Sequence, residues 1–349
     1  MTTKAITGRE FVAAAKKAAT WHTPVACGSG NGLLLLSDGL KATIGLEVDE
    51  SAGQTWPKEA DAGPQTVTGT IESYMRYEGL DVLLALVCGI AGAPTLAGTL
   101  SYANAYKLDT DIDGLFATIA MLKQSEKVWE IPSAKIHGFK LTFEAGKPGK
   151  IVFDLIGDTL QRSSATNTYT TMGSVTVPDS GNRVIMGSGA VFWLNDSSGD
   201  ALDSGDAIAP SKFEMTFKRP MSSEQVAGTA GTTEPADNGF PECSISMTFP
   251  RYDATNDAFF TDWEATTSKK MTVTFTGGLI ETAHYYTFKV SFPNIKIENP
   301  EAPVSGPGKI PMNLKGRCLG RTAAPTGMTG ITQPFQFDVV NKRSTDPLA

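Results

Sequence analysis

The segment Ile131-Pro132-Ser133-Ala134-Lys135-Ile136 has a close variant later in the chain, Phe292-Pro293-Asn294-Ile295-Lys296-Ile297. Each copy is followed by a Pro-Gly-Lys-Ile segment, Pro148 to Leu155 in the first case and Pro307 to Leu314 in the second. A third match precedes both, since Thr68-Gly69-Thr70-Ile71 and the residues up to Glu78 resemble Ser244-Ile245-Ser246-Met247 and the residues up to Asp253. Three matches in one order indicate duplicated domains, because the units of solenoid proteins are only about 20–50 residues long.

The length of the chain supports two domains independently. Its 349 residues exceed the ~250–300 residues at which single cores usually split. We expect an N-terminal helix or arm over residues 1–30, a first β domain over 31–161 and a linker over 162–183. A second β domain is expected over 184–320 and a C-terminal tail over 321–349.

Composition points to a soluble all-β protein and away from several classes. Hydrophobic residues make up 41% of the chain and charged residues 19%, while 35 glycines and 20 prolines supply many turns. The formal charge of -7 argues against a protein that grips nucleic acid, because grip comes from Lys and Arg that neutralise phosphates. The longest apolar run, near Val82 to Val87, is far shorter than the ~20 residues of a membrane span. Four widely spaced cysteines are expected to be buried, reduced thiols: Cys27, Cys88, Cys243 and Cys318.

Apolar residues alternate with polar ones in several segments, as half-buried strands require. The clearest sets are Phe139/Leu141/Phe143, Phe213/Met215/Phe217, Ile245/Met247/Phe249, Met271/Val273/Phe275, Phe288/Val290/Phe292 and, in the tail, Phe335/Phe337/Val339. A short helix is expected after each Arg-Tyr pair, from Leu80 to Val87 and around Phe259 to Trp263. Thr7-Gly8-Arg9-Glu10 has the form of a capping box before an alanine-rich stretch, which predicts an N-terminal helix to about Thr20. That helix packs on its own domain or, alternatively, docks on a neighbouring subunit.

Two long polar segments, Asp49 to Gln65 and Lys218 to Glu242, precede the strands that begin near Thr68 and Ser244. Structureless loops beyond about 12–15 residues are uncommon in compact domains and are usually functional or disordered. Because both halves contain one, we expect these loops to contact neighbouring subunits, with plain mobility as the alternative. The candidate contact residues are Asp49, Glu50, Trp56, Glu59, Asp61, Lys218, Arg219, Glu224, Glu234 and Asp237.

The sequence contains no recognisable catalytic constellation, so we predict that the protein is not an enzyme. His22, His137 and His284 lie outside known motifs, and GxSxG and HExxH are absent. One metal signal remains, because Asp109, Asp111 and Asp113 occupy alternate positions before a glycine, as in the first half of a calcium loop. Ala120 stands where that loop needs its bidentate acid. An acidic turn is therefore the favoured interpretation, and no cofactor is expected.

The segment from Gly69 to Ala91 carries a family resemblance. Its Thr-Ile-Glu-Ser strand, the run Arg76-Tyr77-Glu78-Gly79-Leu80 and a Leu-rich helix that ends in Gly89 resemble the major tail proteins, or tail tube proteins, of long-tailed bacteriophages. The order of strand, long loop, strand, helix and strands is also similar over residues 30 to 320. The resemblance implies a mainly β fold of two tandem β-sandwich or barrel domains, each with a flanking short α-helix. It also implies ring-forming sheets, a long loop that reaches the next ring, and no catalytic residues.

A chain with two such domains is expected to close a ring as a trimer of six pseudo-equivalent domains. The implied partners are further copies of the chain, the tape measure, terminator and distal tail proteins, and double-stranded DNA in transit; membrane insertion is not expected. The implied location is the virion tail, after assembly in the host cytoplasm. Acidic loop residues are then candidates to line the channel, where negative charge keeps DNA from adhering.

Two other functions remain open. One is a distal tail or baseplate-hub ring built on the same domain. The other is a β-sandwich carbohydrate-binding module, which requires an exposed aromatic platform among Trp56, Trp129, Trp193 and Trp263.

Overall fold

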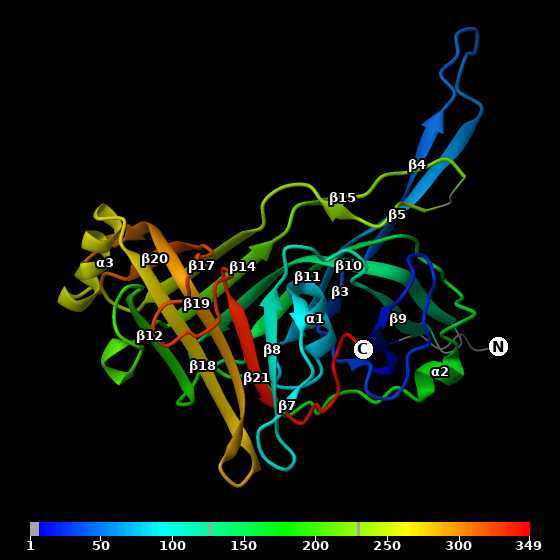
Figure 1. Cartoon of the computed structure of the whole chain (residues 1–349). Coiled ribbons are helices and arrows are strands. Elements are labelled where there is room, and N and C mark those ends of the chain that lie inside the picture. The colour runs from blue at the N-terminus through cyan, green and yellow to red at the C-terminus, as the bar shows by residue number, and fades with distance from the viewer. Residues whose placement is uncertain (1–6, 125–126, 229–230) are drawn as a thin grey trace.

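The computed structural model describes residues 7–124, 127–228 and 231–349, and it consists mainly of antiparallel strands (Figure 1). The predicted β class is confirmed. In chain order the elements are η1 (Gly8–Glu10), β1 (Val12–Ala18), β2 (Gly32–Leu33), β3 (Ser37–Asp38), β4 (Lys41–Val48), β5 (Ala60–Tyr74), α1 (Asp81–Cys88), β6 (Gly89–Ala91), β7 (Thr95–Leu96), β8 (Tyr102–Leu108), β9 (Phe116–Gln124), β10 (Lys127–Glu144), β11 (Lys150–Gly157), α2 (Tyr169–Gly173), β12 (Ala190–Asp196), η2 (Ser204–Asp206), β13 (Ala207–Ile208), β14 (Lys212–Lys218), β15 (Met221–Ser222), β16 (Ala236–Asp237), β17 (Glu242–Phe249), α3 (Ala254–Glu264), β18 (Ser268–Glu281), β19 (His284–Glu301), β20 (Met312–Cys318) and β21 (Gln336–Asn341).

The two halves of the chain pair their strands in the same order. The first half runs β1-β9-β10-β11-β5-β4, and the second runs β12-β18-β19-β20-β17-β14, with every neighbouring pair antiparallel. Each alternating segment of the sequence lies in one of these strands or in β21, which Phe335 directly precedes, and its apolar members are buried. The period-2 pattern therefore identified the strands correctly, because one face of each strand packs into the core.

Both copies of the repeated motif contain two irregularities at matching positions. Pro132 in β10 lies where the pairing with β9 shifts register, and Pro293 in β19 lies where the pairing with β18 shifts. Proline has no N–H to donate, so a strand interior tolerates it at such a bulge. A second shift follows Ile136 in β10 and Ile297 in β19, against β11 and β20 respectively.

The ladders also test the sequence alignment residue by residue. Leu155 pairs with Gly69, and Gly316 pairs with Ile245, so the match between the Thr68 and Ser244 segments is in register. By the same ladders Leu155 corresponds to Gly316 rather than to Leu314. The two Pro-Gly-Lys-Ile segments are therefore two residues out of step in space and do not mark equivalent positions.

One hydrophobic core spans both halves. Phe143 of β10 stacks on Phe275 of β18, with ring centroids 4.2 Å apart, and Phe139 of β10 contacts Phe337 of β21. The sheets are joined directly as well, since β14 pairs with β10 along Gly138 to Glu144. β21 pairs with both β19 and β8, which confirms the strand predicted in the C-terminal tail.

The predicted N-terminal helix is wrong. Residues 8–10 form only a single 3-10 turn, the Thr7 side chain makes no capping hydrogen bond, and the alanine-rich stretch is strand β1. β1 pairs with β9 along its whole length, from Val12 opposite Leu122 to Ala18 opposite Phe116. Ala13, Ala14 and Ala15 are all buried. Tertiary pairing has thus overridden the intrinsic helix preference of alanine.

The two predicted helices exist and pack on equivalent strands, α1 against β10 and α3 against β19. The predicted linker contains α2 and is held in place, because buried Asn167 accepts from the N–H of Cys27 at 2.8 Å and donates to the carbonyl of Val25 at 3.0 Å. The domain boundaries themselves stay predictions.

Candidate functional site

The most exposed feature of the molecule is a hairpin that β4 and the first part of β5 form (Figure 1). We call residues 44–65 the projecting hairpin. Asp49 to Gln65 was predicted as a loop. Residues 49–59 are indeed outside any strand, whereas residues 60–65 belong to β5 and pair with β4, from Ile44 opposite Gln65 to Val48 opposite Ala60. All eight residues of β4 are exposed. The strands therefore leave the body of the protein and carry their side chains into solvent.

The projecting hairpin has two chemically different faces. Ile44, Leu46 and Val48 alternate along one face and are 52%, 68% and 48% exposed. On the other face Glu47 stands directly opposite Asp61. Like charges directly across a ladder are destabilising, and so is apolar surface left in water. Both faces therefore lower the stability of the isolated chain, so its stability does not account for them.

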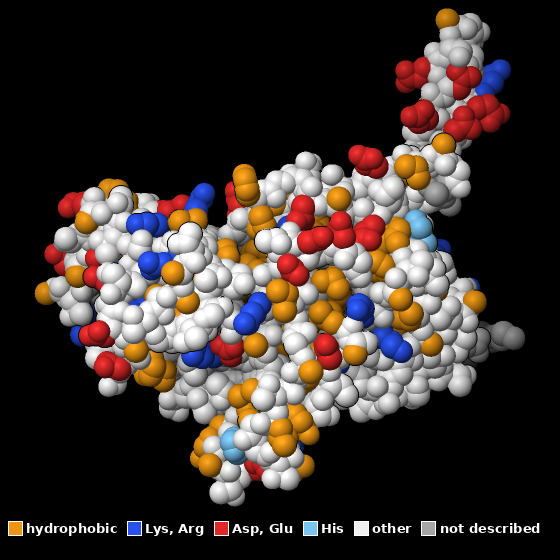
Figure 2. Space-filling model, in the orientation of Figure 1, with side chains coloured by type: hydrophobic (Ala, Val, Ile, Leu, Met, Phe, Trp, Pro, Cys, Tyr) orange, Lys and Arg blue, Asp and Glu red, His pale blue; other side chains and the backbone are white. Residues whose placement is uncertain are grey.

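The predicted contact residues of the first half lie at or near the hairpin tip. Glu50, Glu59 and Asp61 are exposed, and Trp56 is 72% exposed. Asp49 closes the turn: its carboxylate accepts hydrogen bonds from the hydroxyl and main-chain N–H of Ser51, and these bonds lower the pKa of Asp49. Figure 2 shows acidic side chains clustered along this projection.

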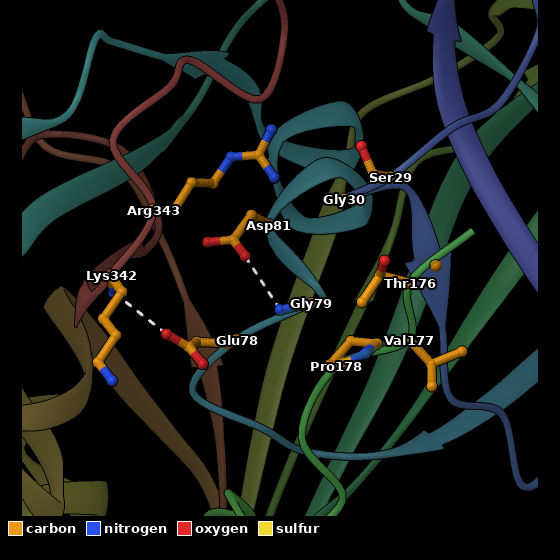
Figure 3. A pocket seen from close by; sticks show the side chains of 11 residues that line it. Ser29, Gly30, Glu78, Gly79, Asp81, Thr176, Val177, Pro178, Lys342 and Arg343 are labelled. Atoms are coloured by element: carbon orange, nitrogen blue, oxygen red, sulfur yellow. Dashed lines mark hydrogen bonds between the residues drawn. The ribbon is translucent and has the colours of Figure 1, made fainter. Parts of the chain in front are cut away.

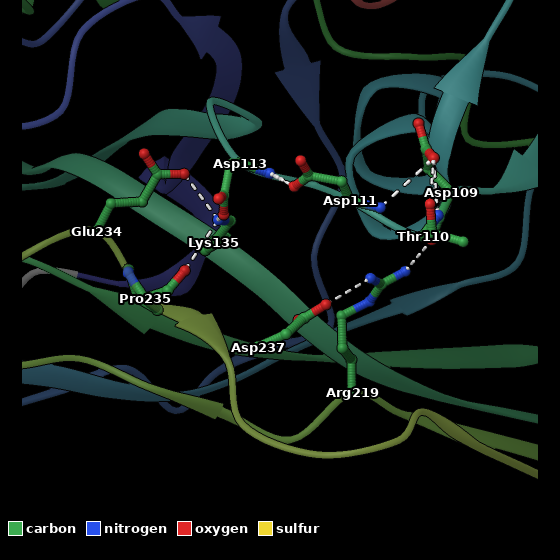
Figure 4. A network of polar contacts seen from close by, with 9 residues as sticks. All are labelled: Asp109, Thr110, Asp111, Asp113, Lys135, Arg219, Glu234, Pro235 and Asp237. Atoms are coloured by element: carbon green, nitrogen blue, oxygen red, sulfur yellow. Dashed lines mark hydrogen bonds and ion pairs between the residues drawn. The ribbon is translucent and has the colours of Figure 1, made fainter.

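The second long segment behaves differently, because it lies across the first half of its own chain. We call residues 219–228 and 231–241 the crossing segment. Its start is fixed by Arg219, which is 1% exposed and whose guanidinium donates to the Asp237 carboxylate at 3.0 Å and to the Asp109 carbonyl at 2.7 Å (Figure 4). Farther along, the Thr232 carbonyl accepts from the Trp21 indole at 2.8 Å. The expectation that this segment is ordered by a neighbouring subunit is therefore not needed to explain its conformation.

A buried lysine provides a second attachment for the crossing segment. The Lys135 ammonium is fully buried and contacts the Glu234 carboxylate at 2.7 Å, the Pro235 carbonyl at 2.9 Å and the Asp113 carboxylate at 3.4 Å (Figure 4). Glu234 also accepts from the N–H of Gly114 at 2.7 Å. Arg219, Glu234 and Asp237 thus form one network, whereas the side chains of Lys218 and Glu224 are exposed to solvent.

The same network accounts for the acidic turn considered as a calcium site. Asp109 accepts from the N–H groups of Thr110 and Asp111, Asp111 accepts from the N–H of Asp113, and Asp113 faces Lys135. These carboxylates serve the turn and its cation rather than converging on a common centre. Within the described ranges, no group of three or more His, Cys, Asp or Glu side chains could hold a metal ion.

Two loops at the end of the molecule opposite the projecting hairpin form a second exposed feature (Figure 1). We call residues 96–101 and 279–285 the end loops. The Glu281 carboxylate joins them by accepting from the N–H groups of Thr99, Leu100 and Ser101 at 2.8–2.9 Å. These bonds lower the pKa of Glu281. The end loops carry four exposed apolar side chains: Leu96, Leu100, Leu279 and Tyr285.

Residues that line a surface hollow between α1 and the C-terminal tail hold these two parts of the chain together (Figure 3). Asp81 accepts from the Tyr106 hydroxyl at 2.8 Å and from the Asn341 amide at 2.9 Å, and its second oxygen accepts from the N–H of Gly79 at 3.2 Å. Glu78 accepts from the N–H of Lys342 at 3.2 Å. These carboxylates tie the tail to the helix.

One histidine has a carboxylate partner. His22 Nδ1 lies 3.0 Å from Asp158 Oδ2, and burial raises the pKa of Asp158. The Ser133 hydroxyl accepts from the main-chain N–H of His22, not from its ring. His22 and Asp158 thus resemble the histidine and carboxylate of a catalytic triad, but the Ser133 hydroxyl does not contact the imidazole as a nucleophile would.

The tryptophans considered for glycan binding lie on four separate elements. Trp56 is in the projecting hairpin, Trp129 in β10, Trp193 in β12 and Trp263 in α3. Trp129 is flanked by two cations, Lys123 and Arg162. The hairpin and α3 are far apart in the molecule (Figure 1), so their rings do not share a platform. Among the described residues, no helix has the length and apolar character to cross a membrane.

Comparison with known families assigns this architecture. A family model described as phage tail tube protein matches residues 8–339. The chain belongs to this family. The tail tube protein is accordingly a structural protein of the phage tail and not a member of an enzyme class, and its place is the tail of the virion. No curated protein matches the sequence closely enough to count as a relative.

Sequence reasoning missed the residues that fix the crossing segment. The sequence pattern marks Lys135 only as part of the repeat, and Arg219 only as a candidate contact residue of a long loop. A lysine between Ala134 and Ile136, in a strand that is buried on both sides, was the available signal, because lysine is almost never fully buried unless it is paired.

Proposed function

We propose that the protein polymerises as rings that stack into the hollow tube of a phage tail. The observation that carries this proposal is the projecting hairpin of a tail tube family member, whose apolar face of Ile44, Leu46 and Val48 is exposed. A two-stranded hairpin is marginally stable alone in water. A contiguous exposed apolar patch usually marks a protein interface. The hairpin is therefore expected to be covered by another copy of the chain.

The position of the end loops supports stacking in one direction. The projecting hairpin and the apolar end loops lie at opposite ends of the molecule (Figures 1 and 2). An interface between two different surfaces of identical subunits is heterologous, and it leaves a free surface at each end for the next copy. Such contacts extend a tube without limit until another protein ends it. The tape measure, terminator and distal tail proteins are the partners that this assembly requires.

Charge supports a channel for DNA. The acidic face of the hairpin, with Glu47, Glu59 and Asp61, is the face that we assign to the lumen. DNA carries about one negative charge per 1.7 Å of its axis, so an acidic wall prevents adhesion during ejection.

The ring is expected to be a trimer of duplicated units. The matching strand order of the two halves and their matching bulges support duplication. Three chains then supply six pseudo-equivalent units around the axis. The alternative, a distal tail or baseplate-hub ring, uses the same units but forms one ring and stops.

Negative-stain imaging across a concentration series tests the proposal. Wild-type protein is expected to form long hollow tubes, whereas isolated rings favour the alternative and persistent monomers refute both. Leu46→Asp should abolish stacking, because it places a charge on the apolar face. Glu47→Gln, on the opposite face of the same strand, is the matched control and should still form tubes.

A further inference from the structure

The junction between the two halves of the chain provides a template for the junction between chains. β14, in the second half, pairs with the C-terminal part of β10, in the first half, on the same edge that β9 occupies farther back. The N–H of Arg219 donates to the carbonyl of His137 at 2.7 Å, and the N–H of Ala145 donates to the carbonyl of Ser211 at 2.9 Å. Odd-numbered residues of β10 therefore direct their backbone groups toward β14.

The strand equivalent to β10 has the corresponding edge free. β19 pairs with β18 only as far as Lys296, while β20 occupies the other edge up to Glu301. Along the described parts of the chain, no strand pairs with the β18 side of residues 299–305. Val304, which the repeat aligns with the fully buried Phe143, is 71% exposed. A core-facing position is thus left uncovered.

The strand equivalent to β14 also has a free edge. The ladders with β5 and β17 align residues 37–43 with β14. The N–H of Gly39 donates to Thr70 of β5 at 2.8 Å, so the backbone groups of Leu40 point away from β5. The N–H of Leu40 is held by the Asp38 carboxylate at 3.1 Å, and Lys41, Ala42 and Thr43 are exposed. This outer edge has no paired strand among the residues that the structure describes.

We propose that residues 37–43 of one copy pair antiparallel with residues 299–305 of the next copy, in the register of the β14–β10 junction; this rests on the proposed ring assembly. Transferring that register places Leu40 opposite Ala302 and Lys41 opposite Glu301. The oppositely charged pair is an independent check, because the transfer used backbone pairing alone, and opposite charges stabilise facing positions of a ladder.

The two prolines of this segment affect the proposed ladder differently. Transfer of the β10 pattern directs the nitrogen of Pro300 toward the free edge, so the proposed ladder lacks one hydrogen bond at that position. Ala302 and Val304 keep their N–H groups on that side. The Pro303 nitrogen points the other way, so it removes no bond from the new ladder.

Disulfide trapping tests the register. Facing residues of a non-hydrogen-bonded antiparallel pair have Cα atoms about 4.5 Å apart, within the ~4.4–6.8 Å range of disulfides. Lys41→Cys protein and Glu301→Cys protein are mixed, assembled and oxidised. Lys41→Cys mixed with Pro303→Cys is the control, displaced by two residues on the same face. The four native cysteines are buried and do not compete.

Covalent dimers are expected in the in-register mixture at roughly tenfold or greater excess over the control. Imaging of the same samples separates this proposal from the tube itself. Tubes without in-register dimers overturn the pairing and leave the tube intact. Dimers without tubes support the pairing and overturn stacking. Equal yields in both mixtures also refute the register. As a second measurement, Lys41→Glu or Glu301→Lys alone should weaken ring formation, and the double exchange should restore it.

Discussion

Replacement of Lys135 by methionine tests whether the buried network holds the crossing segment in place. Methionine keeps the unbranched apolar stem and removes the ammonium group. Two close contacts are lost, to Glu234 at 2.7 Å and to the Pro235 carbonyl at 2.9 Å. The third, to Asp113 at 3.4 Å, contributes little because that carboxylate is 68% exposed.

The magnitude follows from these contacts. Hydrogen bonds to charged groups contribute ~1.5–3 kcal/mol each, and removing the buried ammonium also removes its desolvation cost. Glu234 keeps its bond from the N–H of Gly114 and is 26% exposed, so water relieves part of its loss. We therefore expect the free energy of unfolding to fall by about 2–4 kcal/mol.

Urea unfolding measures the change in stability, and limited proteolysis measures detachment of the crossing segment. Lys140→Met is the matched control, because Lys140 lies on the same strand but is 52% exposed and pairs with Glu214 at 3.6 Å. It should cost less than about 1 kcal/mol. If Lys135→Met stays within about 0.5 kcal/mol of wild type and cleavage between residues 222 and 238 is unchanged, the network does not hold the segment.

Three further changes test the core, a glycine with positive φ and a half-buried histidine. Phe143→Ala should lower the free energy of unfolding by about 3–5 kcal/mol and shift a single urea transition, because the ring stacks on Phe275 of the other half; two separate transitions would show independent cores. Gly69→Ala should cost about 1–3 kcal/mol in the same assay, since φ is +145° and the new Cβ would meet the Gly39 carbonyl oxygen at 2.4 Å; an unchanged midpoint contradicts this. Burial lowers the pKa of His137 below its ordinary 6.5. The neutral histidine's contribution to the free energy of unfolding is therefore complete above pH 6.5 and is lost as the pH falls toward the folded-state pKa. Unfolding of His137→Gln should depend less on pH in that range, and a pH profile identical to wild type would show that His137 does not cause the dependence.

The strands were predictable because their signal is local. Each apolar residue of the Phe213, Met215 and Phe217 set faces the core, and a period of two residues occurs in one short segment. The helices were predictable for the same reason, since α1 and α3 follow apolar stripes. Strand β1 was not predictable from its own residues, because alanine favours helix and only the pairing with β9 selects the extended form.

The candidate site was predictable in part. The length and polar composition of both long segments predicted that they have a role in contacts, and their charge made Asp49 and Asp61 candidate contact residues. Composition did not reveal that one segment is a projecting hairpin and the other crosses its own chain. That difference depends on tertiary contacts. Residues of the first half bond to the crossing segment, whereas all eight residues of β4 in the hairpin are exposed.

Placing two units on one chain changes the energetics of the proposed ring. The β10–β14 junction forms during folding, so it avoids the ~4–15 kcal/mol cost of bringing free subunits together. Only the junction between residues 37–43 and 299–305 then has to form between chains. Its edges must stay unpaired in the free subunit, and Pro300 and the Asp38 carboxylate on the N–H of Leu40 protect them from non-specific pairing.

This protection carries a cost that can be measured. Pro300 supplies no N–H at a position where the equivalent Phe139 of β10 has one to direct toward β14. Pro300→Val restores that donor and makes the edge a better strand. We expect ring assembly, followed by light scattering and imaging, to begin at a several-fold lower protein concentration, since one added hydrogen bond contributes about 0.5–1.5 kcal/mol. Pro307→Val, outside the paired stretch, should leave the threshold unchanged. A lower threshold for both variants, or for neither, would mean that the edge at residue 300 is not where copies meet.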